Sequence, residues 1–159
     1  IVVRLVGSEM CIRDRDRSVI NPIEAIIKIK NDVHFRNHKI ELEVLNDEAA
    51  TVNENVFVRS ITNILNNAID KAGKIIIKAE VNSKMIKINI HDNGPGIDDE
   101  EKANVFKPFY RIDKSRNQNK TNSGLGLATT KSLLGSINGK ISLHDSYLGG
   151  LEVAIVIQN

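Results

Sequence analysis

Hydrophobic residues recur at helical spacing in three segments of the chain. The first follows Asn21-Pro22, an N-cap side chain with proline at the first helical position, and its apolar stripe continues to about residue 35. The strongest stripe runs from Asn55 to Ala72, and a further helix is expected from Gly124 to about Ile137. Each pattern predicts a helix that buries one face against another layer.

Elsewhere the chain carries the patterns of β-strands. Ile40, Leu42 and Val44 alternate with Glu41, Glu43 and Leu45, which predicts a half-buried strand. Asn82-Ser83-Lys84 separates two β-rich runs and predicts a hairpin turn. The other expected strands are Lys74–Val81, Met85–His91, Lys140–Asp145 and Leu151–Ile157.

The order of these elements predicts an α/β (α+β) two-layer sandwich. Its mixed, largely antiparallel sheet would pack on about three helices, because the regular strand–helix–strand alternation of a dinucleotide-binding domain is missing. Residues 92–123 break any regular pattern, although Asp98–Lys102 has the acidic start of a helix. A loop of about thirty residues inside a compact domain is typical of a functional segment.

Composition excludes several classes of protein. The 159 residues, 41% hydrophobic and 26% charged, suit one globular domain. A net charge of +2 is too balanced to favour nucleic acid or an anionic membrane as a partner. The single cysteine excludes a disulfide framework and a four-cysteine zinc site, and it suits a reducing compartment. No apolar run approaches the roughly 20 residues that cross a bilayer, so we expect no membrane contact by this segment.

Residues 1–15 differ from the rest of the chain. They contain no Lys and no Asn, although both are abundant afterwards, and the chain opens without Met. The string from Leu5 to Arg15 resembles translated sequencing-adapter sequence, so we expect a non-native or disordered segment; the alternative is a genuine N-terminal strand. On the first interpretation Cys11 is not part of the natural protein, and residues 16–159 form the domain of a longer protein.

The first motif that carries chemistry is Asn63-Ile64-Leu65-Asn66-Asn67-Ala68, on the longest expected helix. Asn63 and Asn67 are one helical turn apart, so their amides lie on one face. An amide oxygen suits Mg²⁺ that keeps most of its water and its nucleotide phosphates. The alternative is a polar stripe that faces solvent.

The second motif, Asp92-Asn93-Gly94-Pro95-Gly96-Ile97, follows a strand. A hairpin turn is the alternative, but no strand is expected directly after it. An Asp beside two glycines can accept a hydrogen bond from a base amine while bare backbone approaches the ligand.

The third motif, Ser123-Gly124-Leu125-Gly126-Leu127-Ala128, opens a helix whose free N–H groups could meet phosphate. It is neither a Walker A sequence nor a complete GxGxxG, and alone it is more typical of a turn.

In this order, with Val105–Arg111 between the last two, the motifs resemble the N, G1, F and G2 boxes of the sensor histidine kinase ATP-binding domain. The resemblance covers residues 20–159 and implies a Bergerat-type ATP-binding fold. The stretch Phe109–Arg116 is similar to osmosensor-type kinases. Asn138-Gly139 and Gly149-Gly150 fall where that family carries its closing strands.

The resemblance implies a role for each matching residue. Asn67 would bind Mg²⁺, with Asn63 near the phosphates, and Asp92 would recognise the adenine amino group. A lid at 110–122 would supply four candidate phosphate partners, Arg111, Lys114, Arg116 and Lys120, and a solvated surface charge is the alternative for each of them. Phe106 and Phe109 would anchor the lid by packing. The implied catalytic residues are Asn63, Asn67 and Arg116; the implied ATP-binding residues are Asn63, Asn67, Lys71, Asp92, Gly94, Gly96, Ile97, Tyr110, Arg111, Lys114, Gly124, Leu125, Gly126 and Leu127.

Two positions depart from the family pattern. Lys and Tyr often stand three and four residues after the N-box asparagine, where this chain has Asp70 and Lys71. Because an acidic side chain would repel phosphate, we expect Asp70 to point away and Lys71 to take over the cationic contact.

Three other functions share this fold. Related ATPases, such as gyrase-type topoisomerases, use a glutamate where this chain has Asn63, and an amide cannot accept a proton from water. Anti-sigma-factor-type serine kinases usually carry the same glutamate. A degenerate docking module is the third alternative, favoured only by Asp70. Phosphotransfer to histidine, which mainly requires positioning and charge neutralisation, suits these residues best.

None of the four histidines has the neighbours of a phospho-accepting residue. The resemblance therefore implies that the acceptor lies on a separate dimerisation domain of the same kinase, with a response regulator downstream. It also implies a cytoplasmic catalytic domain whose parent protein can be an inner-membrane sensor.

Overall fold

The structure is a computed structural model and describes residues 19–112 and 124–158. Its centre is one five-stranded sheet in the order β2-β4-β5-β7-β6. Strands β2 and β4 are parallel, whereas every other neighbouring pair is antiparallel. The strands are β2 (Ile40–Asp47), β4 (Ile75–Val81), β5 (Met85–Asp92), β6 (Gly139–Asp145) and β7 (Leu151–Gln158).

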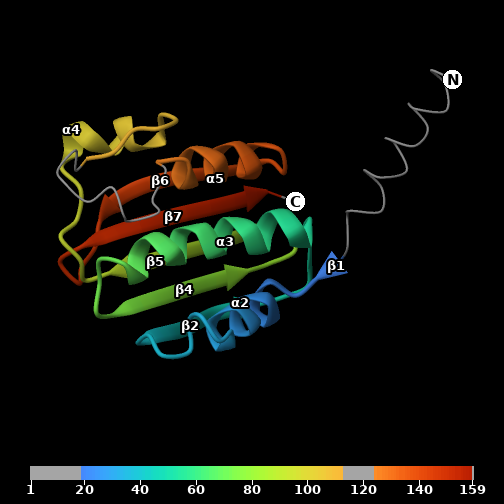
Figure 1. Ribbon diagram of the computed structural model, residues 1–159. Coiled ribbons are helices and arrows are strands. Elements are labelled where there is room, and N and C mark those ends of the chain that lie inside the picture. The colour runs from blue at the N-terminus through green and yellow to red at the C-terminus, as the bar shows by residue number, and fades with distance from the viewer. Residues whose placement is uncertain (1–18, 113–123, 159) are drawn as a thin grey trace, which may run out of the picture.

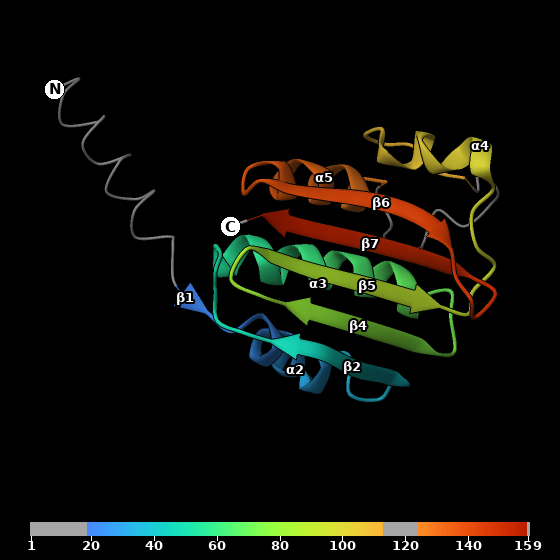
Figure 2. The ribbon, with the colours of Figure 1, turned by 180° about the vertical axis from the view of Figure 1, so that it is seen from behind.

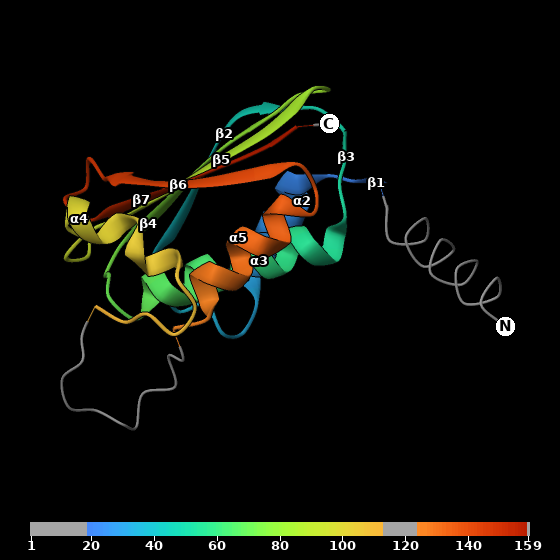
Figure 3. The ribbon, with the colours of Figure 1, turned by 90° about the horizontal axis from the view of Figure 1, so that it is seen from above.

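Three helices cover one face of this sheet, so the domain has two layers (Figures 1 and 3). They are α2 (Pro22–Asn31), α3 (Glu54–Ile69) and α5 (Gly126–Gly135). The short α4 (Asp99–Lys102) and the 3-10 helix η1 (Asn104–Phe106) lie beside the end of β6, where Lys102 Nζ is 2.7 Å from Asp145 Oδ1. Strands β1 (Val19–Ile20) and β3 (Ala50–Thr51) form a separate two-stranded ribbon.

Local sequence explains where the helices begin. The Asn21 side chain accepts hydrogen bonds from the N–H groups of Ile23 and Glu24, and Asn53 caps α3 through the N–H of Val56. The apolar stripe of α3 then faces the isoleucines of β4 and β5. Each such side chain that is fully buried stabilises the fold by about 1.5–3 kcal/mol. Large, fully buried members of this core include Phe57, Ile61, Leu65, Ile77, Ile88 and Ile90.

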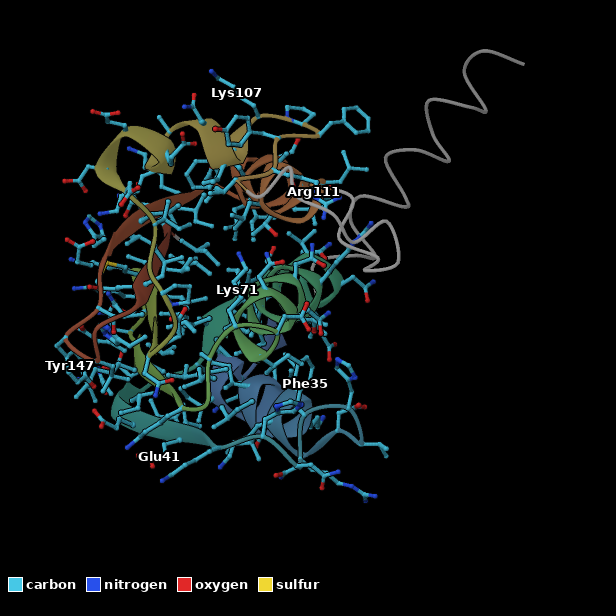
Figure 4. All side chains as sticks on the ribbon, turned by 60° about the vertical axis from the view of Figure 1, so that its left-hand side comes forward. Phe35, Glu41, Lys71, Lys107, Arg111 and Tyr147 are labelled. Atoms are coloured by element: carbon cyan, nitrogen blue, oxygen red, sulfur yellow. The ribbon has the colours of Figure 1, made fainter. Side chains whose placement is uncertain are left out.

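No helix within residues 19–112 and 124–158 covers the other face of the sheet (Figure 2). Ion pairs join neighbouring strands there, with Lys78 Nζ 3.6 Å from Glu43 Oε2. Tyr147, in the turn between β6 and β7, lies on this side (Figure 4), with its ring 4.6 Å from the His91 ring and 4.6 Å from Lys78 Nζ. Burial lowers the pKa of His91, whose Nδ1 is 4.0 Å from Glu152 Oε2.

The predicted fold class is confirmed: a two-layer sandwich of three main helices on a mixed, largely antiparallel sheet. The prediction for Val44 was wrong, because this side chain is 45% exposed. It lies on β2, an edge strand whose register shifts between Val44 and Asn46. The β1–β3 ribbon was not predicted. Residues 1–15, with their predicted non-native origin, lie outside the described part of the chain.

Candidate functional site

Asp92, the last residue of β5, is the anchor of the candidate site. Its side chain is 9% exposed, and its Oδ1 accepts hydrogen bonds from the N–H of Gly94 at 2.8 Å and from the N–H of Leu151 at 3.1 Å. Among the described residues, no group hydrogen-bonds Oδ2. Backbone N–H groups at the end of β5 and at the start of β7 therefore fix Oδ1, and Oδ2 is the oxygen that could meet a ligand.

Bare backbone surrounds this carboxylate. A Cβ atom on Gly150 would lie 2.2 Å from Asp92 Oδ1 and 2.5 Å from the Gly94 nitrogen, which no real side chain tolerates. Gly96, at φ +71°, packs against the Gly150 carbonyl, where an added Cβ would be 3.5 Å from the oxygen. The 92–97 turn therefore packs closely against the start of β7, and only glycine at position 150 leaves room for this contact.

Asn93 holds the same turn to the neighbouring end of β4. Its Oδ1 accepts hydrogen bonds from the N–H of Gly73 at 3.0 Å and of Lys74 at 2.8 Å. The turn is therefore fastened on both sides, to the segment before β4 and to the start of β7. This rigidity holds the Asp92 carboxylate ready for a ligand before one arrives.

The N-box and G2-box residues meet where α3 packs against α5. Asn63 Nδ2 donates to Thr130 Oγ1 at 3.3 Å, and the Thr130 hydroxyl donates to the carbonyl oxygen of Gly126 at 2.8 Å. An added Cβ on Gly126 would lie 3.5 Å from Asn67 Nδ2, so this backbone borders the second amide as well. The two motifs, more than fifty residues apart in the chain, form one polar cluster.

The N-terminus of α5 opens beside this cluster. Leu125 stands at its N-cap and makes no side-chain capping bond, and within residues 19–112 and 124–158 no acceptor pairs with the N–H groups of Gly126 and Leu127, the kind of donors that bind anions at helix N-termini. Gly124 is at φ +69°, and an added Cβ would be 2.8 Å from the Tyr110 carbonyl oxygen. The Phe109 N–H donates to the Gly124 carbonyl at 3.2 Å, which brings the F box against the start of α5.

The aromatic residues of the F box have different environments. Phe106 packs against the core with Lys131 Nζ 5.1 Å from its ring centroid. The expectation that Phe109 packs was wrong: it is 74% exposed, at φ +64°, where its backbone turns toward Gly124. The Tyr110 hydroxyl donates to Glu101 Oε2, and this hydrogen bond to a carboxylate raises the pKa of Tyr110.

The predicted cationic residues are only partly within the described structure. Lys71 follows α3 and Arg111 follows η1; both side chains are exposed (Figure 4). Lys114 and Arg116 lie outside the described residues. Ile97 is half-buried and packs against the core beside the 92–97 turn.

Sequence reasoning missed two residues of this site, Gly150 and Thr130. Gly150 belongs to a visible Gly149-Gly150 pair, but only the fold shows that it presses on Asp92. Thr130 lies one turn after Gly126, and its contact with Asn63 depends on how α3 and α5 pack.

No ligand cluster of three His, Cys, Asp or Glu side chains occurs within residues 19–112 and 124–158. The site does offer amide oxygens, at Asn63 and Asn67, and Mg²⁺ accepts few protein ligands when it keeps water and phosphate.

Residues 52–159 match the family described as histidine kinase-, DNA gyrase B- and HSP90-like ATPases. The chain belongs to this ATPase family. The family region contains every described residue of the polar cluster and of the Asp92 turn. None of the helices in the described ranges is long and apolar enough to span a membrane.

Relatives of this ATPase domain are bacterial sensor kinases. It is 35% identical to the sensor histidine kinase CpxA of Escherichia coli over 104 residues, 65% of this chain and 23% of CpxA. It is 30% identical to the phosphate regulon sensor protein PhoR of Haemophilus influenzae over 138 residues, 85% of this chain and 32% of PhoR. The chain thus spans at most about a third of these relatives.

The fold is shared with a solved histidine kinase domain. The catalytic domain of histidine kinase ThkA superposes with a TM-score of 0.75, covering 90% of this chain and 95% of that domain at 22% identity. The predicted membership of the histidine kinase-like ATP-binding domains is confirmed.

Proposed function

We propose that this domain binds Mg·ATP and donates the γ-phosphoryl group to a histidine on a separate dimerisation domain of the same kinase. In this step the bond between the γ-phosphorus and the β–γ bridging oxygen breaks, and a bond forms to an imidazole nitrogen. ADP leaves, and the imidazole proton passes to solvent. A response regulator would be the final acceptor, and the parent protein would be a sensor, like the CpxA and PhoR that this chain matches.

The single observation that carries this proposal is the asymmetric Asp92 carboxylate. Two backbone N–H groups occupy Oδ1, which leaves Oδ2 for a ligand. A carboxylate oxygen accepts hydrogen bonds, and the exocyclic amine of adenine is a matching donor. The glycine backbone at 94, 96 and 150 allows a flat base to approach closely.

The phosphates would lie toward α5. Its N-terminus would offer N–H groups to phosphate oxygens. Arg111 directly follows Tyr110, whose carbonyl lies against Gly124, and Lys71 is exposed just after α3, so these two cations are the described candidates for phosphate contact. Lys114 and Arg116, the latter expected to stabilise charge during transfer, complete the proposed phosphate set. Asn67, with Asn63, would hold Mg²⁺, which supplies charge neutralisation at the transferred group.

Transfer is favoured over hydrolysis because of the residue at position 63. A hydrolase of this family needs a group there that takes a proton from water, and an amide cannot. The Asn63 Nδ2 is instead committed to Thr130 as a donor. A histidine acceptor brings its own nucleophilic nitrogen, so positioning and electrostatics suffice.

Calorimetric titration with ATP, with and without Mg²⁺, tests the nucleotide site through Asp92→Asn. The two backbone donors would hold the new amide oxygen, so its NH₂ group would face the adenine amine, donor against donor. We expect ATP affinity to fall about 10- to 100-fold, the effect of losing a hydrogen bond to a charged group. Inosine triphosphate, which carries a carbonyl at that position, should lose far less.

Asp98→Asn is the matched control, since Asp98 is exposed and makes no capping hydrogen bond. This variant should bind ATP like the wild-type chain. Equal ATP affinity in Asp92→Asn and the wild type, or no binding by a folded wild-type chain, would contradict the proposal. Supplying a histidine-bearing dimerisation segment in trans with labelled ATP then tests transfer itself.

A further inference from the structure

Thr130 occupies an unusual place for a hydroxyl group, fully buried between α3 and α5 at 0% exposure. Its hydroxyl proton is used in the 2.8 Å hydrogen bond to the Gly126 carbonyl. A hydroxyl has only one proton, so toward Asn63 it can act solely as an acceptor. The 3.3 Å contact therefore requires the NH₂ end of the Asn63 amide at Thr130.

The hydrogen bond to Thr130 determines which end of the Asn63 amide remains for a ligand. The two ends have nearly the same shape, so packing alone distinguishes them poorly, and only hydrogen bonds set the orientation. With Nδ2 engaged by Thr130, Oδ1 remains, and no group among the described residues hydrogen-bonds it. Oxygen is the end that can coordinate a cation or accept from its bound water.

A flipped amide would give the opposite result. The NH₂ group would then face the cation and the waters around it, where a donor with partial positive charge is repelled. The carbonyl end would meet a Thr130 hydroxyl whose proton is already committed. Both contacts would be lost at once, so the hydroxyl separates two states that otherwise differ little in energy.

We propose that Thr130 is a positioning residue for the magnesium–nucleotide complex, because it sets the amide orientation of Asn63. The inference rests on the proposed function. Thr130 acts through Asn63 and touches neither nucleotide nor metal. The same hydroxyl links this orientation to Gly126, whose backbone borders the Asn67 amide and opens α5. One buried side chain thus connects the N box to the G2 box by hydrogen bonds.

A purely structural role is the alternative. Thr and Ser in helices often return a hydrogen bond to the carbonyl four residues earlier, and this satisfies the hydroxyl without any functional purpose. The two roles are separated by Thr130→Val, which keeps the shape and removes the hydroxyl, and Thr130→Ser, which keeps the hydroxyl.

The experiment measures ATP affinity of the full chain calorimetrically, in excess Mg²⁺ and in a chelator. The quantity compared is the factor by which Mg²⁺ strengthens binding. We expect Thr130→Val to reduce this factor about fivefold, the contribution of one ordinary hydrogen bond, with little change in the chelator. Thr130→Ser should retain the wild-type factor. Thermal unfolding shows that each variant is folded.

A cycle with Asn63→Ala makes the test specific. When Asn63 is absent, Thr130→Val should have no further effect on the magnesium factor, since its action passes through that amide. Equal losses with and without Mg²⁺, additive losses in the double variant, or an unchanged factor would overturn the inference. So would ATP binding by the wild type that Mg²⁺ does not strengthen. No ATP binding by a folded wild-type chain would instead contradict the proposed function.

Discussion

Gly150→Ala tests whether the start of β7 shapes the Asp92 carboxylate. The new Cβ would lie 2.2 Å from Asp92 Oδ1, 2.5 Å from the Gly94 nitrogen and 2.6 Å from the Asp92 carbonyl oxygen. Contacts under 3.0 Å are not tolerated, so the 92–94 turn and β7 must separate by about 0.8 Å. Such a shift stretches both hydrogen bonds that fix Oδ1.

The magnitude follows from these contacts. Overpacking of this kind costs about 1–3 kcal/mol, so the free energy of unfolding should fall by roughly 2 kcal/mol. A hydrogen bond to a carboxylate contributes about 1.5–3 kcal/mol. If one of the two were lost, the carboxylate could rotate away from the orientation in which its second oxygen meets the ligand. We therefore expect ATP affinity to fall at least about tenfold, since 1.4 kcal/mol corresponds to a factor of ten.

Urea denaturation and calorimetric titration with ATP measure the two effects. Gly135→Ala is the control, because nothing lies within 4 Å of its added Cβ. Its ATP affinity should equal that of the wild type. If Gly150→Ala bound ATP within a factor of two of the wild-type chain, the argument that backbone contact preorganises Asp92 would be refuted.

Two further predictions concern titratable groups outside the 92–94 turn. Burial lowers the pKa of His91 in the folded protein, whereas in the unfolded chain this side chain takes up a proton as the pH falls through about 6.5. The contribution of the neutral His91 to the free energy of unfolding is therefore complete above that pH and is lost progressively as the pH falls below it. The loss of unfolding free energy between pH 8 and 5.5 should be smaller in His91→Phe, and an equal loss would refute this. Lys102 contacts both Asp99 and Asp145, which raises its own pKa and lowers that of Asp99. Lys102→Met should speed amide hydrogen exchange in α4 and leave exchange in α3 unchanged; equal exchange in α4 would show that these ion pairs do not hold it.

Most of the fold could be predicted because local pattern and tertiary environment agree. The stripe of α3 and the Asn21-Pro22 cap are local signals, and packing against the sheet reinforces them. The exceptions come from position in the sheet. Val44 has the alternation of a half-buried strand, yet it lies on an edge strand with a bulge. No local pattern indicates which strand is at the edge.

The site could be predicted in part for a similar reason. The motifs carry their chemistry in their residue types, so Asp92 and the two N-box amides could be chosen from sequence. Gly150 and Thr130 act by contact with residues far away in the chain, and such contacts appear only when α3, α5 and the sheet are assembled. Phe109 was misjudged because its backbone, at φ +64°, departs from the conformation expected of a bulky residue.

The hydrogen bond from Leu151 to Asp92 has a consequence for the synthesis of this protein. Strand β7 is the last described strand to leave the ribosome, yet it lies between β5 and β6 in the sheet. A nascent chain that ends before residue 151 has the Asp92 motif but lacks one of its two backbone donors and the strand that separates β5 from β6. The hydrogen bonds around Asp92 are therefore completed only when β7 joins the sheet, so the fixed Asp92 carboxylate reports that β5, β7 and β6 have assembled.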